Sequence, residues 1–142
     1  GDVYKRQIMT NNAVIGGHVR LGDGVIIGGN AAVHQFCRIG RKAMIGGLSG
    51  VDRDVIPFGI VTGDRGKLRG LNVIGLKRSG YDEGVVKSIT KAFMFIFKGK
   101  EGTFEDRLAQ AHEKFKDNEM VMEQVKFIDE ALQGRRKIMV AE

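Results

Sequence analysis

An apolar residue recurs at every sixth position through the first third of this chain. The eight members of this column are Met9, Ile15, Leu21, Ile27, Val33, Ile39, Ile45 and Val51. The position after the aliphatic is glycine in five of the eight units. Four places after each aliphatic, a third column holds small or β-branched residues: Ala13, Val19, Val25, Ala31, Cys37, Ala43, Ser49 and Val55. A period of six excludes a simple α-helix, which repeats at about 3.6 residues, and a plain strand, which repeats at about 2.

A unit with one large and one small inward residue is a short strand followed by a tight turn. Three such units close a triangular coil of about 18 residues, and coils stack at roughly the 4.8 Å spacing of neighbouring strands. We expect the glycine after each aliphatic to supply turn angles that a Cβ would hinder. The chain has 21 glycines and one proline, which indicates ordered turns rather than a disordered linker. The repeat therefore predicts a parallel β-helix, with Cys37 as a buried core thiol and not a nucleophile.

The repeat loses its phase near Asp54, close to the only proline, Pro57. Residues 58–61 form a short apolar stretch that predicts one more strand. Residues 63–70 are rich in glycine and basic residues, which is typical of a loop. This loop either cradles a phosphate through its N–H groups and cations or is a solvated turn.

Beyond the loop, apolar residues follow a helical period. We predict a helix with an apolar face over residues 85–97 that stops at Gly99, a second that opens with a capping box of Thr103 and Asp106, and a third that ends at Gly134. The chain then divides into a non-native leader (1–7), β-helix coils (8–62), a basic loop segment (63–80) and a helical domain (81–142). The basic triplet at 135–137 is interpreted as solvated.

Charge and cysteine content narrow the classes of function. The formal charge of +6 and the pI of about 9.6 favour an acidic partner or indicate only a basic surface. Nucleic-acid binding has little support because the basic residues are spread out, without tryptophan or an interleaved aromatic platform. A single cysteine excludes an intrachain disulfide and fits a reducing compartment. No run reaches the roughly 18 apolar residues of a membrane span, so we expect a cytoplasmic protein.

The spacing between His18 and His34 is close to one coil, and both side chains should point outward. We predict that they line one common crevice. Zinc held between subunits by three histidines is the rival use of such residues. The third histidine, His112, lies in a predicted helix as a surface residue, so no metal site is expected.

Three segments carry a resemblance to a known family. They are NNAVIGGHVRLGDGVIIGGNAAVHQFCRIG at 11–40, IGGLSGVDRDV at 45–55 and GLNVIGLKRSG at 70–80. Together they closely resemble the UDP-N-acetylglucosamine O-acyltransferases. The resemblance implies an incomplete left-handed parallel β-helix followed by a C-terminal three-helix bundle, and a homotrimer with its active site between subunits. It also implies transfer of a 3-hydroxyacyl group from acyl carrier protein to the 3-hydroxyl of UDP-N-acetylglucosamine, the first step of lipid A biosynthesis, without a cofactor.

The resemblance implies roles for residues of the coils. The peptide N–H of Gly17 is the expected oxyanion donor, and His18 is expected to support the nucleotide sugar. His34 and Gln35 match residues that line the acyl and sugar pocket. Gly47 matches the position that sets acyl length, where glycine leaves room for a long chain.

Other matched positions concern the sugar and the base. Asn72 and Arg78, in the segment 63–80, match residues that contact the nucleotide sugar, whereas Ile74 and Ser79 depart from an acidic residue and a second arginine of the family. The family's general base is a histidine that precedes the position of His18 by one coil and one further residue, which falls ahead of Gly1. We therefore expect this chain to be inactive on its own, because general-base activation contributes about 10²–10⁴ in rate.

The positive charge suits the acidic acyl carrier protein, and we expect the helical domain, the loop and Arg38, Arg41 and Lys42 to receive it. Two alternatives stay open. The chain is either another hexapeptide-repeat acyltransferase, acting in N-acyl or acetyl transfer, or a non-catalytic β-helix scaffold that only trimerises.

Overall fold

The computed structural model describes residues 7–141 of the chain, and most of the predicted leader lies outside that range. Eight two-residue strands come first: β1 Ile8–Met9, β2 Val14–Ile15, β3 Arg20–Leu21, β4 Ile26–Ile27, β5 Ala32–Val33, β6 Arg38–Ile39, β7 Met44–Ile45 and β8 Gly50–Val51. Two longer strands follow, β9 Gly59–Thr62 and β10 Lys67–Leu71. The helices are α1 Val73–Arg78, α2 Glu83–Lys98, α3 Phe104–Lys114 and α4 Glu119–Gln133.

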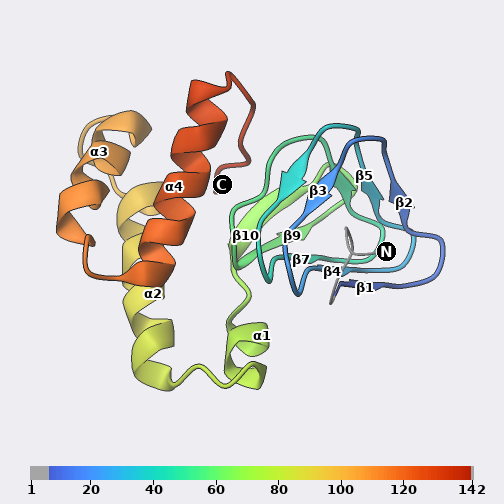
Figure 1. Cartoon of the computed structure of the whole chain (residues 1–142), viewed down its shortest axis with the longest axis horizontal. Coiled ribbons are helices and arrows are strands. Elements are labelled where there is room, and N and C mark those ends of the chain that lie inside the picture. Colours follow the sequence, from blue (N-terminus) through green and yellow to red (C-terminus); the bar gives the residue numbers. More distant parts are fainter. Residues whose placement is uncertain (1–6, 142) are drawn as a thin grey trace.

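The short strands stack in three parallel columns, which form the three faces of a prism. Face A contains β1, β4, β7 and β9, face B contains β2, β5 and β8, and face C contains β3 and β6. The strands β1 to β5 each pair with the short strand three repeat units later, as in the pairs of Ile26 with Ile8 and with Met44, so three units make one coil. Figure 1 shows these faces as the sides of a triangle, with the helices beside it. The predicted parallel β-helix is confirmed.

Both inward columns of the repeat are buried. Six aliphatics from Leu21 to Val51 are at most 8% exposed, and the small column between them is at most 5% exposed. Cys37 is 4% exposed, and burial raises the pKa of its thiol to about 11. Because a buried, protonated thiol is a poor nucleophile, the interpretation of Cys37 as a core residue is supported.

The reason for the glycines differs from the one predicted. The corner residues with positive φ are the third ones of each turn, and apart from Gly24 they are not glycine: His18, Phe36 and Leu48 have φ of 57°, 68° and 63°. The glycines after the aliphatics face the next coil instead. A Cβ on Gly16 or Gly22 would lie 2.4 or 2.5 Å from a backbone nitrogen of that coil. Close stacking of the coils, and not turn geometry, therefore requires glycine there.

One coil is shorter than the rest. Val33 pairs with Val51, three full repeat units later. A coil of the same length would pair Ile39 with Pro57, but Ile39 pairs with Val55 instead. The loss of phase predicted near Asp54 is thus a shortened corner between Val51 and Val55. Val55 consequently joins the column of Ile39 and not the small column in which the repeat placed it.

The segment after the coils is more ordered than predicted. A loop is predicted for residues 63–70, but β10 pairs antiparallel with β9, and only the turn between the two strands is a loop. The short helix α1, which no periodicity indicated, follows at once. Leu68 of this hairpin is 1% exposed and belongs to the hydrophobic core.

The three predicted helices are confirmed as α2, α3 and α4. Thr103 and Asp106 form both hydrogen bonds of a capping box at the start of α3. Helix α4 packs on the prism, where buried Gln124 donates a hydrogen bond to the carbonyl of Pro57 at 2.9 Å. Its neighbour Glu123 accepts hydrogen bonds from Arg41.

The tail after α4 returns to the prism. Ile138 bridges Asp54 and Ala141 bridges Leu68, so the tail adds extended backbone to the coil and the hairpin. Arg136 donates to the carboxylate of Asp54 at 2.7 Å. The interpretation of the triplet 135–137 as merely solvated is therefore wrong for Arg136.

Candidate active site

His18 lies at the corner between faces B and C, directly below Phe36 of the next coil. Their rings stack with centroids 5.1 Å apart and planes 5° apart. This pair lines a cavity of about 520 Å³ together with Arg20, Arg38 and Arg136. The arrangement offers a flat aromatic surface that suits a planar ligand, whereas two of its three guanidinium groups, those of Arg38 and Arg136, pair with Asp54.

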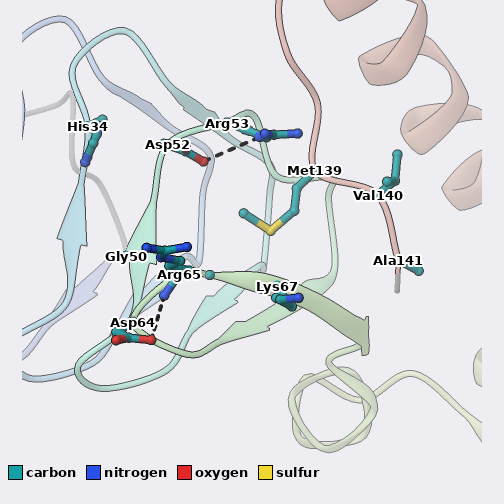
Figure 2. A pocket seen from close by; sticks show the side chains of 11 residues that line it. His34, Gly50, Asp52, Arg53, Asp64, Arg65, Lys67, Met139, Val140 and Ala141 are labelled. Carbon is teal, nitrogen blue, oxygen red and sulfur yellow. Dashed lines mark hydrogen bonds and ion pairs between the residues drawn. The ribbon is translucent and has the colours of Figure 1, made fainter.

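His34 lies at the same corner but lines a different cavity, of about 570 Å³, shown in Figure 2. The β9–β10 hairpin contributes Arg65 from its turn and Lys67 from the start of β10 to this cavity, and the C-terminal tail contributes its wall from Met139 to Ala141. The hairpin thus presents cations toward a hollow, as a phosphate cradle requires, although Asp52 and Asp64 lie among them. The prediction that both histidines line one crevice is wrong within this chain.

Gly17 and Gln35 occupy the second position of this corner in successive coils, and both are exposed. The carbonyl of Gly17 accepts a hydrogen bond from the N–H of Phe36 at 3.0 Å. Among residues 7–141, the N–H of Gly17 donates to no other group, and a Cβ at Gly17 would meet nothing within 4 Å. The open space around Gly17 leaves room for a substrate to approach this backbone closely, as an oxyanion donor requires.

Gly47 lies at a second corner, between faces A and B. A Cβ on Gly47 would lie 3.2 Å from the carbonyl oxygen of Gly29, so the two glycines meet closely at this corner, beside the exposed side chain of Leu48. Beside it, the outward residues of face A form an apolar row in register: Ile26 beside Met44, and Met44 beside Ile60. The sequence analysis missed this row, although apolar outward residues spaced about one coil apart are its signal.

Asn72 and Arg78 lie at the third corner, where α1 begins and ends. The amide oxygen of Asn72 caps α1 by accepting from the N–H of Gly75 at 3.1 Å, and Asn72 is only 7% exposed. Arg78 and Ile74 are exposed on α1. Ser79 accepts a hydrogen bond from the ammonium group of Lys42 at 3.1 Å.

Two of the basic side chains expected to bind the carrier protein instead form ion pairs with acidic residues of this chain. Arg38 donates to the carboxylates of Asp54 and Glu130 and lies over the ring of Phe127, 4.1 Å from its centroid. Arg41 pairs with Glu123 at 2.9 Å. These side chains hold α4 on face C, so the prediction that they form a docking surface is wrong.

The predicted site residues therefore occupy three different corners of one prism. Within residues 7–141, no three histidine, cysteine, aspartate or glutamate side chains are grouped to hold a metal ion. His112 instead pairs with Asp129 across the α3–α4 contact at 2.7 Å. None of the helices in the same range is long and apolar enough to span a membrane.

A family model described as UDP-N-acetylglucosamine O-acyltransferase, domain 2, matches residues 54–139. The chain belongs to the UDP-N-acetylglucosamine O-acyltransferase family. A member from Rhizobium johnstonii, an acyl-[acyl-carrier-protein]–UDP-N-acetylglucosamine O-acyltransferase, is 45% identical over 121 residues, which are 85% of this chain and 44% of the relative. The enzyme of the same name from Paracoccus denitrificans is 44% identical over 126 residues, 89% of this chain and 47% of the relative.

Solved structures of family members share the fold. The Arabidopsis UDP-N-acetylglucosamine acyltransferase has a TM-score of 0.90 and 35% identity, covering 95% of this chain and 49% of that one. The Francisella novicida enzyme has a TM-score of 0.83 and 26% identity, covering 96% and 49%. The chain thus spans about half the length of the UDP-N-acetylglucosamine O-acyltransferases that it matches.

Proposed function

We propose that a protein containing this chain transfers a 3-hydroxyacyl group from acyl carrier protein to the 3-hydroxyl of UDP-N-acetylglucosamine, the first step of lipid A biosynthesis. The observation that supports it most is the apolar row of Ile26, Met44 and Ile60 on the outside of face A, beside the corner where Gly47 meets Gly29. An outward apolar row is costly in water unless something covers it. An acyl chain that runs along face A past Gly47 is a suitable cover.

Three copies of the chain would complete the site. His18 and His34 lie at one corner of the prism, whereas Asn72 and Arg78 lie at another. One substrate meets both corners only if they come from neighbouring prisms packed side by side. This supports a homotrimer with its sites between subunits, in the cytoplasm, where a single free thiol such as Cys37 stays reduced.

We assign roles on the same basis. The N–H of Gly17 stabilises the oxyanion that forms on the thioester carbonyl. His18 positions the sugar, and His34 with Gln35 lines the pocket. Arg78, exposed at the end of α1, offers a guanidinium fork to the pyrophosphate, whereas Asn72 acts by fixing α1.

The test is an exchange of segments. The 121 matched residues of the Rhizobium johnstonii relative are replaced by those of this chain, and acyl transfer from acyl carrier protein to UDP-N-acetylglucosamine is followed by mass spectrometry. We expect turnover within about tenfold of the parent, and a loss of about 10²-fold or more on His18→Ala.

His112→Ala is the matched control, since this histidine is on α3 and pairs only with Asp129. It should leave turnover unchanged. A folded, trimeric exchange protein without acyl transfer would overturn the proposal. Equal losses in the two histidine variants would overturn the role of His18.

A further inference from the structure

Helix α2 carries an exposed basic stripe on the side that faces away from its own bundle. Lys87, Lys91, Met94 and Lys98 follow one another at steps of four, three and four positions and are all exposed. At about 100° per residue, the four side chains fall within an arc of about 60°. The stripe is about 16 Å long, which is three helical turns.

The other side of α2 is fully occupied by the core. Val86, Ile89, Ala92, Phe93, Ile96 and Phe97 are buried, and α2 contacts the other helices and strand β10. Lys87 and Lys91 form no ion pair with another residue of the described range 7–141. The charges of these two lysines are therefore available to a partner.

Met94 lies in the middle of the stripe and is 51% exposed. An exposed, flexible thioether between lysines gives the stripe an apolar centre with a cationic rim, which is the usual anatomy of a transient interface. A surface that is only solvated needs charge but no exposed methionine. The combination indicates a partner that is acidic and has an apolar spot of its own.

We infer that this stripe is the docking surface for an acidic helix of the acyl carrier protein, which rests on the function proposed above. The structure narrows the choice of surface because Arg38 and Arg41 are engaged with Glu130 and Glu123. The cations of the hairpin turn lie among acidic side chains of the same cavity. By contrast, the only acidic residue of α2 itself is Glu83, in its first turn.

The position of the stripe is also suitable. Helix α1, which carries Arg78, packs against α2, and α2 begins shortly after Arg78 in the chain. A carrier bound along α2 is thus next to the segment assigned to the nucleotide sugar. Complementary charge would speed its encounter and weaken with salt.

The experiment measures binding of purified holo-acyl carrier protein to the full 142-residue chain and to charge-reversed variants. Lys87→Glu with Lys91→Glu should weaken binding about tenfold or more, and Met94→Ala about threefold. The control is Lys116→Glu with Lys126→Glu, on the α3–α4 side, which makes the same change in net charge. It should weaken binding less than about twofold.

Equal effects of the two double variants, or no binding to the unchanged chain, would overturn the docking surface. The docking surface would also be overturned if the chain bound vesicles of anionic phospholipid and the α2 variant lost this binding but still bound the carrier protein. In the exchange enzyme, the α2 variant should raise KM for the acylated carrier and leave KM for UDP-N-acetylglucosamine unchanged. An exchange enzyme that is inactive with and without the α2 substitutions refutes the proposed function. An active exchange enzyme whose KM for the acylated carrier is unchanged by the α2 substitutions refutes only the docking surface.

Discussion

The carboxylate of Asp54 accepts a hydrogen bond from Arg136, 82 residues later in the chain, at 2.7 Å. The same carboxylate accepts one from the side chain of Arg38 at 2.9 Å, and Asp54 is 2% exposed. Two guanidinium groups therefore share one buried anion. This contact joins the shortened corner, the prism wall and the C-terminal tail.

Asp54→Asn should destabilise the chain by about 2–3 kcal/mol. Loss of one partner of a fully buried pair costs about 3–5 kcal/mol, and the value is smaller here because Arg136 is about a third exposed. Urea unfolding followed by circular dichroism measures it. Asp52→Asn, at an exposed neighbour, should change stability by less than about 0.5 kcal/mol, and a similar loss in both variants would contradict the assignment.

The same carboxylate makes stability depend on pH. Burial raises the pKa of Asp54, but hydrogen bonds from Arg136 and Arg38 outweigh burial and leave the pKa below its usual 3.8. The stabilisation is therefore complete above that value and is lost as pH falls through the lower pKa of the folded state. The difference in unfolding free energy between the wild type and Asp54→Asn should be constant from about pH 7 to 5 and shrink toward about pH 2. A difference that grows in acid would contradict this sign.

The thiol of Cys37 should be nearly inert in the folded chain. With a pKa of about 11, its thiolate fraction at about pH 8 is about a hundredfold below that of an ordinary cysteine. Labelling by an aromatic disulfide reagent should be slow in buffer and complete within seconds in denaturant. Rapid labelling of the native chain would show that the coil opens at this position.

Ser49 is buried, and its hydroxyl has no hydrogen-bond partner in the described structure. Ser49→Ala should leave stability unchanged or raise it by about 0.5–1 kcal/mol, because an unsatisfied polar group is removed. The reverse change at a matched position, Ala31→Ser, should lower stability by about 1–2 kcal/mol. Thermal unfolding of both variants gives the comparison, and a loss of stability in Ser49→Ala would point to an unseen partner.

Gly47→Leu tests the passage of the acyl chain. The leucine side chain would fill the corner near Gly29, because even a Cβ added at Gly47 would lie 3.2 Å from the carbonyl oxygen of Gly29. In the exchange enzyme, kcat/KM should fall about tenfold or more for long acyl donors and much less for short ones. Equal losses for donors of all lengths would show a general disruption and not a length limit.

The features that the sequence determined are local or periodic. The six-residue columns specify the prism because each coil stacks the same kinds of residue on the coil below. The apolar face of α2 and the capping box of Thr103 with Asp106 likewise depend only on residues that are close together in the sequence. The corner with His18, Gly17 and His34 followed from motifs in these coils.

Other features were decided only by tertiary structure, because they depend on partners that are distant in the chain. The sequence alone does not show that Arg136 pairs with Asp54, 82 residues away. Nor does it show that Arg38 and Arg41 pair with Glu130 and Glu123, because these pairs form only when α4 packs on face C. The β10 strand pairs with β9 at the end of the prism, a contact that the glycine-rich sequence of residues 63–70 did not indicate. The two histidines line separate cavities, because the hairpin and the last tail residues border only the cavity of His34, whereas Arg136 of the tail borders that of His18. Sequence periodicity reports what repeats between neighbouring coils, and these contacts occur once.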